Sequence, residues 1–175
     1  MIGKDKKLSY MFYYLAYKFD NFLFTIKKYS IKYKITLYPN IDSSVNIGTE
    51  VRFLGSTETF HIGPGTYINE AILATGVDSI IKIGSYCAIG YRVSIKASTH
   101  DKNNPTPSKN SKLEMLNKDI VIGNHCWIGD NVFIREGVVL GDHVIVGANS
   151  VVTKSFPDNV VIAGVPAKII SHLKK

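Results

Sequence analysis

The sequence predicts an all-β solenoid of stacked triangular coils, with a helix before it and one long loop within it. The main observation is a period of six residues that begins at Ile41, in which an aliphatic residue opens each unit. A small or β-branched residue follows four places later in most units. This period matches neither the 3.6 of a helix nor the alternation of a hairpin sheet. It is typical of a solenoid whose short strands each end in a tight turn.

The clearest part of the repeat has five consecutive units, IGNHCW-IGDNVF-IREGVV-LGDHVI-VGANSV. The five units open with Ile122, Ile128, Ile134, Leu140 and Val146, and Val152 opens the unit that follows them. Three units close one coil, and successive coils stack at roughly 4.8 Å. We expect the first and fifth residues of a unit to point inward, and the Gly or Asn in second place to fit a corner with positive φ. A β-sandwich would space its strands at about 8–12 residues without a fixed step.

The repeat is looser in the first half of the chain. Its opening residues there are Ile41, Ile47, Phe53, Ile62, Ile68, Ile83, Ile89 and Ile95. The steps 53–62 and 68–83 each hold three extra residues, which we expect to form bulged corners. Cys87 and Cys126 share the fifth place of their units, so we interpret both as small interior side chains rather than as reactive thiols or a disulfide.

Residues 8–29 predict an amphipathic helix. Lys18 and Asp20 interrupt its apolar pattern, which argues against a membrane span, and no small-residue cleavage site marks a signal peptide. We expect the helix to cap the first coil, because terminal repeats need covering. A competing hypothesis is that its Lys and Tyr side chains also contact an anionic membrane surface. The apolar positions are Leu8, Met11, Phe12, Leu15, Phe19, Phe22, Leu23 and Ile26.

The charge of the chain is concentrated in this N-terminal arm. Residues 1–36 carry eight Lys against two Asp, whereas the remaining residues carry 13 Lys and Arg against 12 acids. The nearly neutral body argues against nucleic-acid binding. We therefore divide the chain into a helical arm (1–40), a solenoid domain (41–169, with a loop at 101–119) and a tail (170–175).

The blocks IGNHCWIGDNVFIREGVVLGDHVIVGANSVVTKSFP and NVVIAGVPAKII resemble the hexapeptide-repeat acyltransferases. The resemblance covers roughly residues 41–169 and is strongest to maltose and galactoside acetyltransferases and to bacterial polysaccharide O-acetyltransferases. It implies a left-handed parallel β-helix, a homotrimer, and acetyl-CoA bound in the cleft between subunits. Serine acetyltransferases carry a large helical N-terminal domain, whereas this arm has about forty residues.

His100 is the catalytic candidate. It stands in SIKASTHDKNN, at the head of the irregular segment 101–119, and a loop of this length inside a solenoid is usually functional. The resemblance implies that a His in this place is the general base. An imidazole can accept a proton from a sugar hydroxyl, whose oxygen then attacks the thioester carbonyl.

His125 and His143 share the outward fourth place, so we expect them to be solvent-exposed, and His61 and His172 have no supporting context.

The resemblance also supplies the binding residues. Trp127 is placed beside the thioester and the acceptor, and Asn69 is a candidate acceptor ligand. Lys168 stands where many relatives have Arg, and as a point charge it would lose bidentate contact with a CoA phosphate. The residues implied for CoA are Trp127, Gly147, Ala148, Thr153, Lys154, Gly164, Pro166, Ala167 and Lys168.

These features predict an acetyl-CoA-dependent O-acetyltransferase that acts on a sugar hydroxyl, with surface polysaccharides or their precursors as the acceptor class. Three alternatives stay open: N-acetylation of a nucleotide-linked amino sugar, acetylation of a streptogramin-type antibiotic, and a non-catalytic scaffold. No metal-ligand spacing occurs among His, Cys, Asp and Glu, so we expect no metal in the chemistry. The cytoplasmic supply of acetyl-CoA and the unpaired cysteines predict a cytoplasmic protein, with the inner face of the membrane as a further hypothesis.

Overall fold

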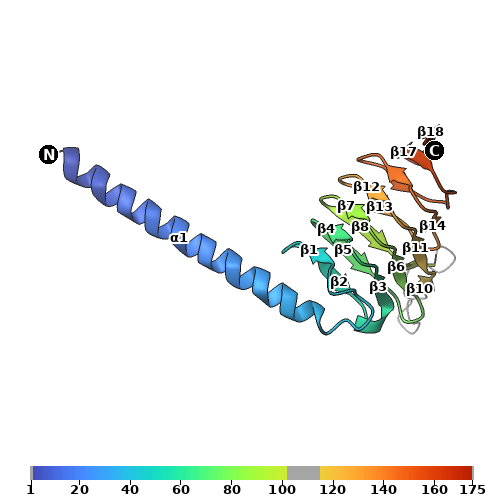
Figure 1. Ribbon diagram of the computed structural model, residues 1–175, viewed down its shortest axis with the longest axis horizontal. Helices are drawn as coiled ribbons and strands as arrows, with labels where there is room; N and C mark the ends of the chain where they lie inside the picture. Colours follow the sequence, from blue (N-terminus) through green and yellow to red (C-terminus); the bar gives the residue numbers. More distant parts are fainter. Residues whose placement is uncertain (1, 102–114, 175) are drawn as a thin grey trace, which may run out of the picture.

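The computed structural model describes residues 2–101 and 115–174, without the side chains of residues 2–8 and 34. It consists of one long helix, α1 (Ile2–Ile35), and a triangular prism of stacked β-coils (Figure 1). The predicted fold class is confirmed: the chain forms a left-handed parallel β-helix with an N-terminal helix.

Three parallel sheets form the sides of the prism. We call the seven-stranded sheet wall one, the five-stranded sheet wall two and the four-stranded sheet wall three. Wall one contains β1 (Asn46–Ile47), β4 (Tyr67–Ile68), β7 (Ala88–Ile89), β12 (Trp127–Ile128), β15 (Ile145–Val146), β17 (Val160–Gly164) and the antiparallel β18 (Ala167–His172). Wall two contains β2 (Arg52–Leu54), β5 (Ala71–Ala74), β8 (Val93–Lys96), β13 (Phe133–Ile134) and β16 (Val151–Val152). Wall three contains β3 (Phe60–Ile62), β6 (Ile81–Ile83), β11 (Ile120–Ile122) and β14 (Val139–Leu140).

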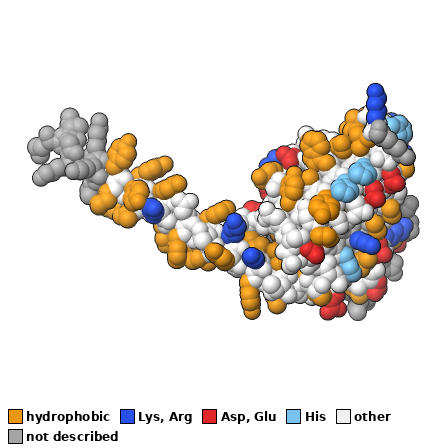
Figure 2. Space-filling view, in the orientation of Figure 1, with side chains coloured by type: hydrophobic (Ala, Val, Ile, Leu, Met, Phe, Trp, Pro, Cys, Tyr) orange, Lys and Arg blue, Asp and Glu red, His pale blue; other side chains and the backbone are white. Residues whose placement is uncertain are grey.

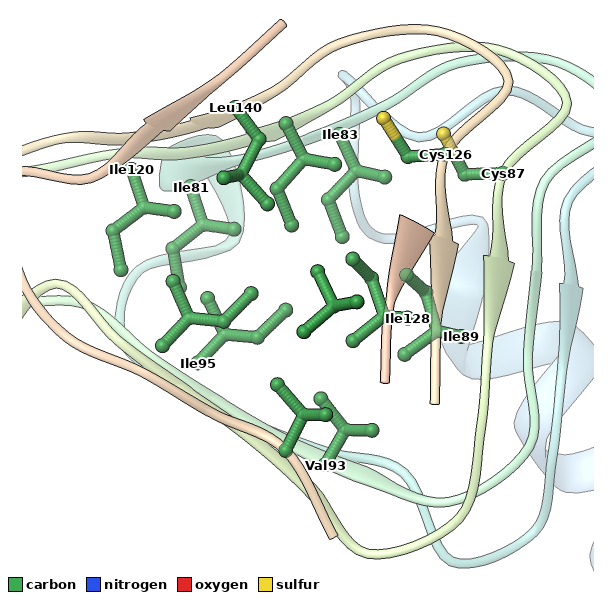
Figure 3. Packing of buried hydrophobic residues seen from close by; sticks show 14 of the residues in the cluster. Ile81, Ile83, Cys87, Ile89, Val93, Ile95, Ile120, Cys126, Ile128 and Leu140 are labelled. Carbon is green, nitrogen blue, oxygen red and sulfur yellow. The ribbon is translucent and has the colours of Figure 1, made fainter. Parts of the chain in front are cut away.

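The register of the walls places the predicted opening residues directly above one another. In wall one, Ile68 pairs with Ile89, Ile89 with Ile128, and Ile128 with Val146. These side chains fill the interior of the prism, as Figure 3 shows for Ile89 and Ile128. Because each coil buries its apolar residues against one another and against the coils next to it, the six-residue period directly fixes the stacking.

The corners correct one expectation about glycine. Positive φ occurs at the fourth place of the units, in residues such as His125 (φ 54°), Asn131 (φ 57°) and His143 (φ 56°), not at the second-place Gly. The second-place Gly is required for a different reason. A Cβ on Gly123 would lie 2.6 Å from the backbone of Gly141 in the next coil. Glycine therefore permits close stacking of coils at this position, without any need for positive φ.

Gly123→Ala is accordingly expected to destabilise the protein by about 1–3 kcal/mol, because two stacked backbones must separate to admit the methyl group. The matched control is Val77→Ala, at a side chain that is 90% exposed. The control should stay within about 0.5 kcal/mol of the parent. Thermal unfolding of the three proteins measures the difference, and an unchanged melting temperature for Gly123→Ala would contradict this account of the corner.

The irregular corners all lie on one edge of the prism, where the chain passes from wall two to wall three. We call this edge 2–3. It holds residues 55–59, with the 3₁₀ helix η1 (Thr57–Thr59), residues 75–80, and the segment that contains β9 (Ser98–His100) and β10 (Met115–Asn117). The bulged corners expected in 53–62 and 68–83 are confirmed. Leu73, five residues after Ile68, is an interior position that the six-residue step missed.

Helix α1 does not cap the first coil. It extends away from the prism (Figure 1), and the side chains of residues 9–30 are exposed. The expectation of a cap is therefore wrong except at the end of α1, where Ile35 packs against the core. An aromatic cluster of Tyr38, Phe53 and Phe60, with ring centroids 4.9 to 6.0 Å apart, covers the start of the prism instead.

Candidate active site

His100 lies at the end of β9, a short strand that leaves edge 2–3 and pairs antiparallel with β10. Its partner in the register is Met115, and its side chain is exposed. At the base of this β9–β10 ribbon the Lys118 backbone N–H donates to the Ala97 carbonyl at 2.9 Å, and the Ala97 N–H donates to the Ala74 carbonyl of the neighbouring coil at 2.8 Å. The described residues at the two ends of the segment thus agree with the prediction that His100 stands at its head. Residues 102–114 lie outside the described part of the chain.

Two of the predicted CoA-binding residues lie on the same edge as His100. Thr153 and Lys154 follow β16 in wall two, and both are exposed. The Lys154 Nζ lies 5.6 Å from the centre of the Phe156 ring. Strand β16 is two strands from β8, so these residues lie roughly 10 Å along the prism from the base of the ribbon.

A second group lies on wall one and on the edge where wall one passes to wall two, edge 1–2. Trp127 projects from β12 and is 57% exposed. Asn69 follows β4, and Gly147 and Ala148 follow β15. Ala148 is exposed, and a Cβ on Gly147 would lie 3.0 Å from the Cβ of Ala163. The absence of a Cβ at Gly147 therefore lets this corner lie close to Ala163 of the next strand in wall one.

The remaining predicted residues form the hairpin that ends the prism. Strands β17 and β18 pair antiparallel, and Gly164 pairs with Ala167 across the turn. The Val165–Pro166 peptide bond is cis. Ala167 is buried, whereas Pro166 and Lys168 are exposed. The ammonium of Lys168 is thus available to an anion in solvent.

A single chain does not bring the two groups into one pocket. His100 and Lys154 lie on edge 2–3, whereas Trp127, Asn69 and Ala148 lie on wall one and edge 1–2. A 590 Å³ groove is instead found beside α1, and its lining includes none of these residues. A site that uses both groups requires wall one of one chain to face edge 2–3 of another.

The other histidines behave as their position in the units predicts. His125 and His143 are exposed, as expected. Sequence reasoning missed that they form a column with Tyr86: the Tyr86 and His125 ring centroids are 5.3 Å apart, and those of His125 and His143 are 4.9 Å apart. Their shared fourth place in successive coils was the signal that could have predicted this stacking.

The two cysteines are interior side chains, as predicted. Cys87 and Cys126 are both 1% exposed and unpaired, and Figure 3 shows them on neighbouring coils. A hydrogen bond with Cys87 and burial both raise the pKa of the Cys126 thiol. A buried thiol with a raised pKa is a poor nucleophile. Among residues 2–101 and 115–174, no three His, Cys, Asp or Glu side chains are placed to hold a metal ion.

Buried charge on edge 2–3 was also missed. Glu136, in the coil after the ribbon, is 8% exposed, and the Arg135 Nε donates to its Oε1 at 2.9 Å. The unit IREGVV places Arg135 where most units have Gly, which was the available signal. The pair neutralises a carboxylate that would otherwise be costly to bury.

Residues 119–154 match the family model of the bacterial transferase hexapeptide (six repeats). These residues fall in the part of the chain where the six-residue period is clearest. The predicted resemblance to hexapeptide-repeat acyltransferases is confirmed by relatives and by solved structures. The galactoside O-acetyltransferase of Escherichia coli is 38% identical to it over 113 residues, which are 65% of this chain and 54% of that protein.

A putative lipopolysaccharide biosynthesis O-acetyltransferase of E. coli is 38% identical over 109 residues, which cover 59% of this chain and 55% of that protein. This chain thus spans about half the length of the curated relatives it matches. A hexapeptide-repeat acetyltransferase of Vibrio cholerae, complexed with acetyl-CoA, matches the fold with a TM-score of 0.62 at 25% identity. That match covers 87% of this chain and 88% of the other.

Proposed function

We propose that this protein is an acetyl-CoA-dependent O-acetyltransferase that acts on a sugar hydroxyl of a bacterial surface polysaccharide or of its precursor. The observation that carries the proposal is the exposed His100 at the head of the β9–β10 ribbon, within coils similar to those of sugar and polysaccharide O-acetyltransferases. The similarity includes a V. cholerae acetyltransferase complexed with acetyl-CoA, which supports acetyl-CoA as the donor.

His100 acts as the general base in the proposed reaction. Its imidazole accepts the proton of the sugar hydroxyl while the oxygen forms a bond to the carbonyl carbon of the acetyl thioester. The tetrahedral intermediate then collapses, the C–S bond breaks, and the imidazolium returns its proton to the departing thiolate of CoA. Exposure of His100 allows a large glycan acceptor to reach it.

The active unit in this proposal is a homotrimer. The His100 edge of one subunit faces wall one of its neighbour, and the cleft between them holds CoA beside Trp127 and Ala148. The separation of these residues onto different sides of one prism supports this arrangement, because one chain alone leaves the site incomplete. Sedimentation equilibrium of the purified protein tests it, and a monomer with full acetyltransferase activity would exclude it.

Lys168 binds a phosphate group of CoA in this proposal. We expect Lys168→Gln to raise the Kd for CoA by about five- to tenfold, because the variant loses one exposed charge-assisted contact. Lys82→Gln, which removes an exposed charge from wall three, is the matched control and should leave the Kd unchanged. Isothermal titration calorimetry measures both values. Equal Kd values for the two variants would remove Lys168 from the site.

The proposed activity is tested by incubating the protein with acetyl-CoA and a panel of acceptors. Release of free thiol reports transfer, and mass spectrometry identifies the product. The panel contains neutral sugars, polysaccharide fragments, nucleotide-linked amino sugars and a streptogramin. Acetyl esters on sugars support the proposal, whereas amide products would favour N-acetylation and a product from the streptogramin alone would favour antibiotic inactivation. No thiol release above the background of acetyl-CoA hydrolysis with any acceptor would refute it.

A further inference from the structure

Helix α1 presents a continuous apolar stripe that no described residue of the chain covers. The stripe consists of Phe12, Leu15, Phe19, Phe22 and Ile26, which follow one another at steps of three and four residues. Such steps place side chains on one face of a helix. All five are at least 50% exposed, and Figure 2 shows hydrophobic side chains along the length of the helix.

The stripe faces away from the prism. Ile31 and Ile35, at the end of α1, line the groove against the first coil, and Lys27 forms an ion pair with Glu50 of that coil. Ile35 follows Ile26 by nine residues, which is two and a half helical turns and therefore the opposite side of the helix. The contacts that hold α1 thus orient the stripe outward.

The charge of α1 indicates what covers the stripe. The helix region carries eight Lys against two Asp, so α1 is strongly positive, and Lys18 lies beside the stripe. We propose that α1 lies flat on an anionic lipid bilayer, with the stripe inserted among the acyl chains and the lysines at the headgroups. Each Lys near an anionic surface adds favourable energy, and Phe, Leu and Tyr are typical of helices at this depth.

Two other arrangements fit these observations less well. Among the described residues, no helix is long and apolar enough to cross a bilayer. Packing of the stripe against α1 of a second copy would bring two helices of like charge together, with few acidic side chains to offset their lysines. An anionic surface removes this repulsion, whereas a second helix adds to it.

Vesicle co-sedimentation of the full-length protein tests the proposal. The probes are phosphatidylcholine vesicles with and without phosphatidylglycerol, at low and at high salt. We expect binding to the anionic vesicles that weakens with salt. The variant Phe12→Ser/Phe19→Ser/Phe22→Ser should bind at least about tenfold more weakly, because it loses most of the buried apolar area.

The matched control alters three aromatic side chains on the opposite face, Tyr13, Tyr17 and Phe24, which are also exposed. Tyr13→Ser/Tyr17→Ser/Phe24→Ser should retain binding within about twofold of the parent. Equal loss in both triple variants, or binding that ignores phosphatidylglycerol, would overturn the proposal. The proposal would also be overturned if the parent did not bind vesicles and, without lipid, formed an oligomer that the stripe variant did not form. That result would identify a second copy as the partner of the stripe. Acetyl transfer to a soluble acceptor does not depend on vesicle binding. The proposed function and the membrane proposal can therefore each fail without the other.

Discussion

His100→Ala is expected to lower the rate of acetyl transfer by roughly 10²- to 10⁴-fold, the usual contribution of a general base. The hydroxyl of a sugar is a weak nucleophile, and without the imidazole its proton has no acceptor at the start of the reaction. Steady-state kinetics with acetyl-CoA and the acceptor found in the panel measure the loss. Because His100 is exposed at the end of β9, the melting temperature should change little.

Two measurements distinguish catalysis from a structural role. Added imidazole should restore part of the activity of His100→Ala, since a small base can occupy the vacated space. His172→Ala, at an exposed histidine in β18, is the matched control and should keep the parent rate. Turnover of His100→Ala within about threefold of the parent would contradict the assignment, because a general base contributes far more than this.

The coils could be predicted from the sequence because each interior position repeats a local rule. Ile122, Ile128 and Ile134 stack on equivalents one coil away, so the period of six contains nearly all the information that the packing needs. The corner geometry did not follow from composition. Gly123 stands in second place because of the backbone of the next coil, a contact between residues 18 positions apart that no single unit reveals.

The helix and the site were harder to predict for a different physical reason. An apolar stripe predicts that something covers it but does not identify what, and α1 lies away from the coil it was expected to cap. The candidate site residues were named individually from their motifs, yet His100 and Trp127 lie on different sides of one prism. In the proposed trimer their distance is set by the contact between two subunits, which the sequence pattern of one chain does not encode.

Ile128→Ala is expected to destabilise the protein by about 2–5 kcal/mol, because it leaves a cavity in the narrow interior of the prism. Ile128 is fully buried, and it stacks between Ile89 of the preceding coil and Val146 of the next. Urea unfolding followed by circular dichroism measures the change. Ile170→Ala removes a side chain of the same size that is 63% exposed, and it should stay within about 0.5 kcal/mol of the parent.

The position of Ile128 in the middle of the stack gives a second, sharper readout. In a solenoid each coil is stabilised by its two neighbours, so a cavity between them weakens the coupling of the N-terminal coils to the C-terminal ones. Trp127 is the chain's single tryptophan and lies in the same strand, β12, where its fluorescence reports this part of the prism. In Ile128→Ala the fluorescence transition should precede the circular dichroism transition, whereas in the parent the two should coincide. Coincident transitions and an unchanged midpoint in the variant would mean that the stacking of Ile128 on Ile89 and Val146 does not hold the coils together.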